Sequence, residues 1–360
     1  MDDLVNTFSL SPAALGNLTS AVQFGFISGT LVFAILSIAD RNSPSKVFFV
    51  CALIGAIFNA SIVIDGQSLT SLIALRFTTG FFLAGIYPVG MKIAADYFDK
   101  GLSKSLGFLV GALVLGTAFP HLLKGSISSL PWRQVIVVTS GLASLGGLIM
   151  MIFVPDGPYR SPSQKLDFTA LFTVFKKADF RAAAFGYFGH MWELYSFWAF
   201  VPFMLLHYTT INTEQVFNIP LLSFIIIGLG GAACIIGAYI SESLGTKRAA
   251  WIALLLSGTC CLISPLMFQL NHGSLFITFL IFWGLVVIAD SPLFSTLVAQ
   301  NAPAQFKGTA LTIVNCIGFS VTIISIQLLT LLISSVNPTY VFLVLALGPV
   351  FGLASLRKRS

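Results

Sequence analysis

Charge is what this sequence has least of. Charged residues make up 9% of its 360 residues, whereas hydrophobic residues make up 56%. A soluble domain carries about 25% charged residues, so this composition is typical of a membrane protein and excludes an ordinary soluble domain. The formal net charge of +6 does not indicate nucleic-acid binding, because the cations lie in short loops and not along one face or helix.

Sequence signatures of catalysis are missing as well. The chain has four histidines, and neither His-Glu-x-x-His nor Gly-x-Ser-x-Gly occurs. The sequence therefore lacks the clustered catalytic motifs that a membrane-embedded enzyme would need. The absence of a Walker A loop excludes ATP as the energy source. All five cysteines lie in apolar runs, at spacings that match neither a disulfide framework nor a zinc site. We expect no enzymatic activity, no cofactor and no metal, and interpret the cysteines as small packing residues.

What the sequence does have is long apolar runs. A helix needs about 20 apolar residues to cross the hydrocarbon core of a membrane. The sequence predicts eleven such spans, at residues 13–38, 47–64, 69–95, 104–123, 132–154, 182–206, 216–240, 248–269, 275–299, 308–334 and 338–356. The predicted fold class is therefore all-α, a polytopic membrane protein embedded in a lipid bilayer.

One long polar segment interrupts this pattern. Residues 155–181 divide the chain into an N-terminal bundle, residues 1–154, with five spans and a C-terminal bundle, residues 182–360, with six. Most Lys and Arg residues lie in alternate connections, and the positive-inside rule makes that side, together with the C-terminus, cytoplasmic. An odd number of spans then puts the N-terminus outside, and we expect that a first helix is missing through truncation or a late start codon.

A short charged loop occurs at equivalent points of the two halves. An acidic residue closes one span and cations open the next. The first copy contains Asp40, Arg41 and Lys46, and the second contains Glu242, Gly245, Lys247 and Arg248. Internal repeats of this kind are typical of transporters that are built around a central site.

These loops, with two further motifs, resemble the major facilitator superfamily. Arg76-Phe77-Thr78-Thr79-Gly80 is similar to the motif of the family's fourth helix, and Lys307-Gly308-Thr309 is similar to the start of its eleventh. The first loop departs from the pattern, since Ser43 stands where the family has glycine. The resemblance implies two pseudo-symmetric six-helix bundles, with the first span matching the family's second helix. It also implies that the repeated loops form a cytoplasmic gate.

Four ionisable residues lie deep in predicted spans: Arg76, His190, Glu193 and Asp290. A charge at that depth is costly unless it has a partner or faces a wet cavity, so each is a functional candidate. The resemblance places all four on the fourth, seventh and tenth helices of the family, which line its central cavity. The sequence thus predicts a substrate and proton pathway along these helices.

His190 and Glu193 are spaced i, i+3 on one helix. Glu193 lies roughly 16 Å from the start of its span, near mid-membrane. We interpret the two as a pair that exchanges a proton and contacts substrate, with Tyr195 and Trp198 walling the site. The alternative is a charge-neutralised pair that locks this span to a neighbour.

The other two candidates leave several roles open. Asp290 precedes Ser291-Pro292, where proline disrupts the helix. Three roles for Asp290 stay open: it binds a cation or a proton, it bridges to Arg76, or it caps the disrupted turn. Arg76 either binds an anionic substrate or has the structural or coupling role that the resemblance favours.

The sequence therefore predicts a secondary active transporter, a monomer in the plasma or inner membrane. It would move a small-molecule substrate, a polar solute, by alternating access and would be coupled to protons. The alternatives are a nutrient sensor on a transporter scaffold and an inactive truncated copy. Organic acids, amino acids, sugars and an exported metabolite all fit the deep ionisable residues.

Overall fold

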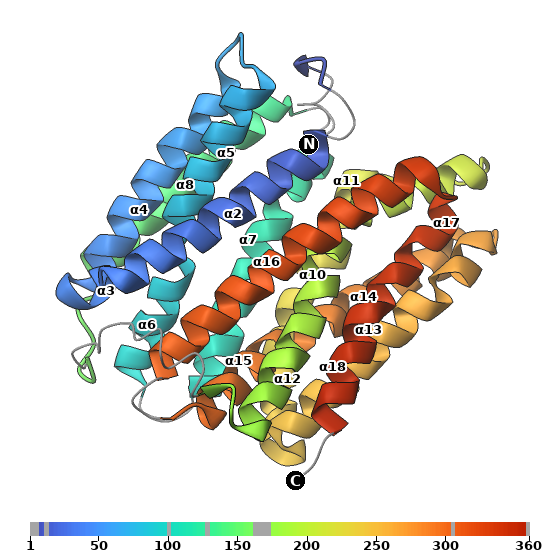
Figure 1. The fold of residues 1–360 in the computed structure, drawn as a ribbon. Helices are drawn as coiled ribbons and strands as arrows, with labels where there is room; N and C mark the ends of the chain where they lie inside the picture. Colours follow the sequence, from blue (N-terminus) through green and yellow to red (C-terminus); the bar gives the residue numbers. More distant parts are fainter. Residues whose placement is uncertain are drawn as a thin grey trace. The chain divides into compact units, whose positions relative to one another are not determined.

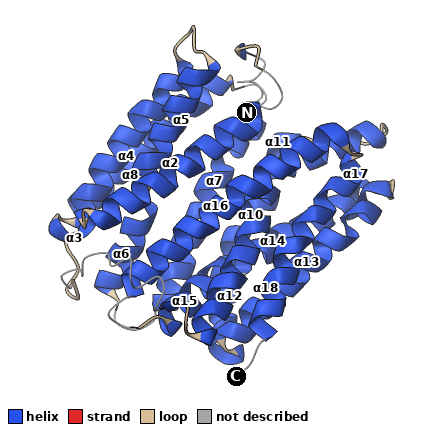
Figure 2. Ribbon diagram, viewed as in Figure 1, coloured by secondary structure: helices blue, strands red, loops and turns tan. Residues whose placement is uncertain are grey.

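The computed structural model describes residues 7–10, 14–98, 102–126, 130–160, 174–303 and 307–357. Within these residues the regular structure is helical throughout (Figure 2). Eleven segments are long and apolar enough to cross a membrane: Ala14–Ile35, Pro44–Val63, Leu69–Ala94, Lys104–Gly125, Trp132–Phe153, Ala178–Ile211, Ile219–Leu244, Thr246–Gln269, Gly273–Asn301, Thr309–Ser335 and Pro338–Arg357. The predicted fold class and each predicted span are confirmed, with differences of a few residues at the ends.

Proline marks the places where helices begin. Pro44, Pro88, Pro220, Pro292 and Pro338 each lie in the first two positions of a helix. A proline there removes an N–H that has no partner within the helix, and its fixed φ suits the first turn. Two of these prolines, Pro88 and Pro292, follow a break inside a membrane span, so each of those two spans consists of two helical pieces.

The chain forms two compact units. Unit 1 comprises residues 1–105 and 130–170, and unit 2 comprises residues 106–129 and 171–360. The predicted division into bundles 1–154 and 182–360 stays a prediction, and much of its linker, residues 161–173, lies outside the described residues.

Unit 1 is built around a close pair of helices. Its helices are α2 (Ala14–Ile35), α3 (Ile38–Arg41), α4 (Pro44–Ala60), η1 (Ser61–Val63), α5 (Leu69–Leu83), α6 (Tyr87–Tyr97) and α8 (Trp132–Phe153). Helices α2 and α5 lie side by side (Figure 1). A Cβ atom built on Gly25 would lie 2.0 Å from the Phe77 carbonyl oxygen, and one on Gly80 would lie 2.0 Å from the Val22 carbonyl oxygen. Only glycine permits this approach of the two backbones.

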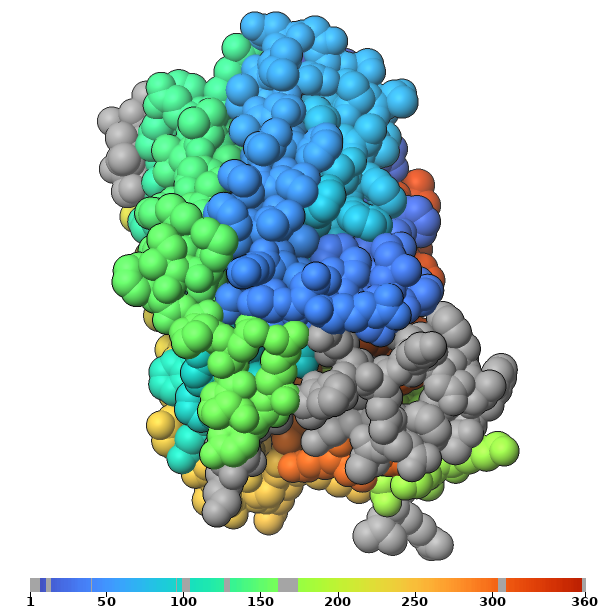
Figure 3. Space-filling model, turned by 90° about the vertical axis from the view of Figure 1, so that its left-hand side faces the viewer, coloured from blue at the N-terminus to red at the C-terminus, as the bar shows by residue number. Residues whose placement is uncertain are grey.

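One face of unit 1 is strongly apolar. Helices α4 and α8 run side by side on it, as the blue and green atoms of Figure 3 show. On α8, Val137 is 52% exposed, Ile152 59% and Phe153 73%. A contiguous apolar surface of this kind is unfavourable in water. It suits contact with lipid chains.

Unit 2 surrounds one long helix. It contains most of α7 (Leu102–Ser126), then α10 (Ala178–Ile211), α11 (Ile219–Gly228), α12 (Gly230–Leu244), α13 (Thr246–Gln269), α14 (Gly273–Ala289), α15 (Ser291–Asn301), α16 (Lys307–Ser335), α17 (Pro338–Val341), η3 (Phe342–Ala346) and α18 (Leu347–Arg357). Helix α10 packs against α15, α16 and α18 (Figure 1). Its side chains are buried along nearly its whole length, so polar groups on it lie inside the unit.

Candidate functional site

A buried ion pair joins α10 to the break between α14 and α15. His190 Nδ1 lies 2.8 Å from Asp290 Oδ1, and each side chain is 1% exposed. Asp290 is the single residue between the end of α14 and Ser291 at the start of α15, where the sequence predicts a disrupted helix at Pro292. Its side chain makes no capping hydrogen bond. The carboxylate of Asp290 is therefore directed to His190 and not to the helix end.

Aromatic and amide groups enclose this pair. The rings of Tyr187 and Phe294 lie 6.1 and 6.0 Å from the His190 ring, and the Tyr187 hydroxyl donates to Asn315 Oδ1 at 2.9 Å. Within the described residues, His190 Nε2 and Asp290 Oδ2 are buried without a hydrogen-bond partner. Buried polar atoms nearly always have one. The pair thus keeps unused hydrogen-bonding capacity on both of its members.

Glu193, one turn further along α10, has different partners. Its side chain is fully buried. Trp283 Nε1 on α14 donates to Oε1 at 2.6 Å, and two groups on α13 donate as well, Cys261 Sγ to Oε1 at 3.3 Å and Ser257 Oγ to Oε2 at 2.9 Å. All three donors are neutral. Glu193 therefore connects α10 to two neighbouring helices.

His190 and Glu193 do not make the mutual contact that their spacing suggests. Among the described residues no hydrogen bond or ion pair joins them, since one pairs with Asp290 and the other with α13 and α14. Residues three apart on an α-helix point about 60° away from one another. On a helix that is surrounded by other helices, 60° is enough to face different neighbours.

Tyr195 and Trp198, the two residues of the predicted aromatic wall, pack against one another on α10. The ring centroids of Tyr195 and Trp198 are 5.3 Å apart, and Tyr195 lies 5.2 Å from Phe319 on α16. Trp198 is 5% exposed, and within the described part of the chain its Nε1 has no hydrogen-bond partner. The wall thus contains one buried N–H donor that the described residues do not use.

Arg76 lies in unit 1, on α5. Its Nη1 donates to Asn59 Oδ1 at 3.3 Å, and Asn59 Nδ2 donates in turn to Ser140 Oγ at 3.0 Å. Its Nε is buried, with no hydrogen-bond partner among the described residues. Arg76 therefore connects α5 to α4 and α8 through neutral groups and keeps one donor unused.

The first charged loop, residues 39–46, is attached to the chain that follows α8. Ser43 Oγ donates to Asp156 Oδ1 at 2.7 Å. Arg160, which pairs with Asp156, donates through Nη2 to the Asn42 carbonyl oxygen at 2.7 Å. Ser43 thus has a role of its own in holding this loop.

The backbone explains why the two loops differ at this point. Gly245 has φ +82°, a conformation that favours glycine, whereas the equivalent Ser43 has φ −60°, which any residue adopts. The side chain of Asp40 lies outside what the structure describes. The remaining charged members of both loops are exposed: Arg41, Lys46, Glu242, Lys247 and Arg248.

Sequence reasoning missed the partners of Glu193. All five cysteines are buried and free, and Cys261 in addition donates through its thiol to Glu193. Ser257 and Cys261 are spaced i, i+4 and so share a helix face. That polar pair in an apolar span was the available signal.

Comparison with known proteins gives matches to transporters. The chain is 29% identical over 38% of its length to an ascochitine biosynthesis cluster MFS transporter of Didymella fabae. It is 28% identical over 43% to the efflux pump FUB11 of Gibberella moniliformis, and 28% identical over 44% to NiaP of Bacillus subtilis, which is named as a niacin/nicotinamide transporter. These matches span 26%, 26% and 39% of the relatives' own lengths.

The fold is also similar to a solved structure. A bacterial homologue of the human lysosomal transporter Spinster matches with a TM-score of 0.73 at 16% identity, over 98% of this chain and 91% of the other. The family model described as Major Facilitator Superfamily matches residues 1–326. The relatives that the chain matches are transporters and not enzymes. The chain belongs to the Major Facilitator Superfamily.

Proposed function

We propose that this chain is a secondary active transporter that moves a small polar solute by alternating access and is coupled to protons. The observation that carries the proposal is the buried His190–Asp290 ion pair at the break between α14 and α15. An ionisable pair at membrane depth is costly and is typical of proton relays. The membrane is the plasma or inner membrane, with the C-terminus cytoplasmic.

The pair offers a direct link between a proton and a helix contact. Imidazolium and carboxylate attract one another strongly where water is excluded. A proton taken up by Asp290 removes the charge of its carboxylate and with it this attraction. The contact between α10 and the α14–α15 break then weakens. Because the break is already a discontinuity in the helix, it is the natural place for a local change of angle.

In this proposal Glu193 has an anchoring role. Sequence reasoning gives Glu193 the coupling role, but its three neutral donors hold it on α13 and α14. A carboxyl group accepts these bonds in either protonation state, since one of its oxygens remains an acceptor when the other is protonated. We therefore assign coupling to Asp290 and His190, and helix anchoring to Glu193.

The solute would meet the donors that the described residues leave unused. In unit 2, Trp198 Nε1 is of this kind, and Tyr195 extends the aromatic surface beside it. In unit 1, Arg76 Nε is a separate donor of this kind. N–H donors and aromatic faces fit a solute with acceptor atoms and a flat apolar part. The name of NiaP points to such a solute, and the name of FUB11 points to export as one direction.

The two charged loops complete the proposal as a cytoplasmic gate. Its members are Asp40, Arg41 and Lys46 in the first loop, and Glu242, Gly245, Lys247 and Arg248 in the second. The hydrogen bonds of Ser43 and Arg160 hold the first loop against the start of the linker. Bundles 1–154 and 182–360 would be the two bodies that this gate closes, in a monomeric protein.

The test is transport by the purified protein in proteoliposomes. Counterflow against a panel of labelled organic acids, amino acids, sugars and nicotinate identifies a solute. Accumulation of that solute is then measured under an imposed pH gradient. We expect Asp290→Asn to keep counterflow and to lose gradient-driven accumulation, and Glu193→Gln to keep both. Accumulation that survives in Asp290→Asn and disappears in Glu193→Gln would return the coupling role to Glu193.

A further inference from the structure

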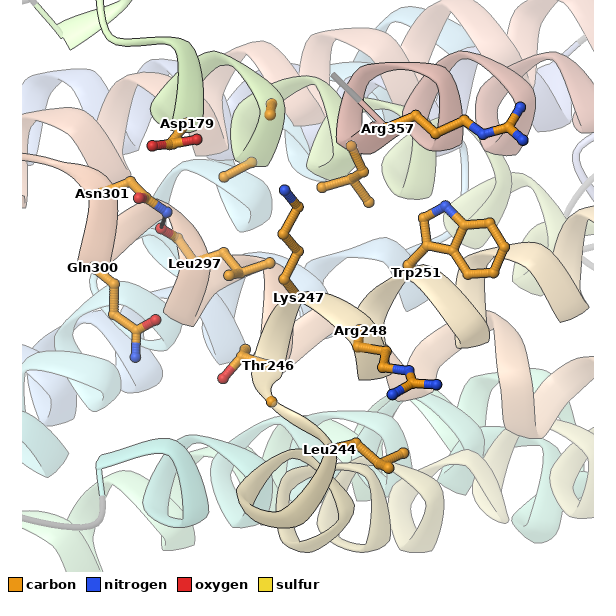
Figure 4. A pocket seen from close by; sticks show the side chains of 14 residues that line it. Asp179, Leu244, Thr246, Lys247, Arg248, Trp251, Leu297, Gln300, Asn301 and Arg357 are labelled. Carbon is orange, nitrogen blue, oxygen red and sulfur yellow. Dashed lines mark hydrogen bonds between the residues drawn. The ribbon is translucent and has the colours of Figure 1, made fainter. Parts of the chain in front are cut away.

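A cavity of about 690 Å³ opens at one end of unit 2, away from the His190–Asp290 pair. It lies between the starts of α10 and α13 and the ends of α12, α15 and α18 (Figure 4). Three cations line it, Lys247, Arg248 and Arg357. The positive-inside rule assigns this end to the cytoplasmic side in the proposed topology.

The charge of the cavity favours an anion. Asp179 is the single acidic residue in its lining, so the three cations are in excess. Within the described residues, no hydrogen bond or ion pair engages the side chain of Lys247, Arg248 or Arg357. Lys247 extends across the middle of the cavity, with Asp179 to one side and Trp251 to the other (Figure 4). The three cations thus line one cavity in which Asp179 is the single opposite charge.

An apolar stripe leads out of the cavity along α13. It begins at Trp251 in the lining and continues through Leu255, Leu262 and Leu266, which are 39%, 58% and 54% exposed. Leu255, Leu262 and Leu266 lie 4, 11 and 15 residues beyond Trp251, and at about 100° per residue they point within about 60° of Trp251 around the helix axis. From Trp251 to Leu266 the stripe is roughly 22 Å long, more than half of a hydrocarbon core of about 30 Å.

We propose that this cavity binds the phosphate-bearing head group of an anionic phospholipid, with one acyl chain along the stripe on α13. Guanidinium groups bind phosphate oxygens through paired hydrogen bonds, and basic pockets between membrane helices are suited to anionic head groups. Tryptophan is favoured at the head-group level, which is where Trp251 would lie. The amides of Gln300 and Asn301 line the same cavity and would bind head-group hydroxyls.

The test is quenching of tryptophan fluorescence by brominated lipids. The full chain is reconstituted in phosphatidylcholine vesicles that contain increasing amounts of brominated phosphatidylglycerol or, in parallel, of brominated phosphatidylcholine. The Trp251→Phe variant identifies the share of the signal that comes from Trp251. We expect phosphatidylglycerol to quench Trp251 at several-fold lower mole fraction than phosphatidylcholine does. Equal quenching by the two lipids would overturn the proposal.

Variants of the lining give the matched comparison. Neutralising Arg248 or Arg357 with glutamine should lower the selectivity for phosphatidylglycerol by about five-fold each, and Asp179→Asn should raise it. The control is the double variant Lys176→Gln/Lys177→Gln, which removes two exposed cations outside the lining and should leave selectivity unchanged. A loss of selectivity as large in this control as in the lining variants would show a diffuse surface charge and refute the site.

Competition with a soluble phosphate compound distinguishes a lipid head group from a free phosphate as the ligand of the cavity. Glycerol phosphate at millimolar concentration is added to the vesicles with brominated phosphatidylglycerol. We expect it to leave the quenching of Trp251 unchanged, because it lacks the acyl chain that follows the stripe. Relief of quenching by glycerol phosphate would assign the cavity to a soluble phosphate compound instead and overturn the lipid proposal.

Discussion

Replacing Glu193 with alanine should destabilise unit 2 by roughly 2 kcal/mol. The carboxyl group accepts three hydrogen bonds from α13 and α14, and an interhelical hydrogen bond in a membrane protein contributes about 0.6 kcal/mol on average. Ser257 keeps a second partner in the Leu254 carbonyl oxygen, at 3.2 Å. Among the described residues the buried N–H of Trp283 has no other hydrogen-bond partner, so the substitution leaves it unsatisfied, which adds to the cost.

The assay is unfolding of the purified protein in mixed micelles of increasing sodium dodecyl sulfate content. A loss of about 2 kcal/mol corresponds to roughly a 30-fold increase in the unfolding equilibrium constant. Glu193→Gln is the matched control, because its amide oxygen still accepts from Trp283 while the charge is removed. We expect it to lose less than half as much stability as Glu193→Ala. If the two variants unfold alike, the hydrogen bonds do not anchor α10 and the reasoning is refuted.

The remaining predictions concern packing and the gate. Gly80→Ala should lower stability by about 1–3 kcal/mol or more, since its Cβ would lie 2.0 Å from the Val22 carbonyl oxygen. Gly141→Ala is the control and should be neutral, because a Cβ there would meet nothing within 4 Å. Equal melting temperatures of the two variants would contradict this prediction. Asp40→Asn and Glu242→Gln should slow the transport cycle and leave solute affinity within a few-fold, as judged by binding and counterflow together. Loss of binding in both would remove the gate assignment.

The sequence predicts the fold well because each span is a local property. About 20 apolar residues in a row specify a membrane helix whatever its neighbours are, and the eleven spans follow from that rule alone. The break at Asp290 is equally local, since Pro292 cannot continue the hydrogen bonding of the preceding turn. These features need no knowledge of which helices touch.

The contacts between helices could not be predicted from the sequence, because they are not local properties. His190 and Asp290 are far apart in the chain, and their contact depends on how α10, α14 and α15 are rotated about their axes. Helices that are apolar on all sides carry little information about that rotation. The donors of Glu193 are one case. The attachment of Ser43 to Asp156 is another, since it joins a loop to the start of a polar segment.

Proton movement that accompanies the solute tests the central claim most directly. Proteoliposomes are loaded with a pH-sensitive dye, and a solute identified by counterflow is added without an imposed pH gradient. The account predicts that the solute moves protons in the wild type and in Glu193→Gln, and that Asp290→Asn exchanges solute with no change of internal pH. Solute-driven proton movement that persists in Asp290→Asn would contradict the assignment of coupling to the His190–Asp290 pair.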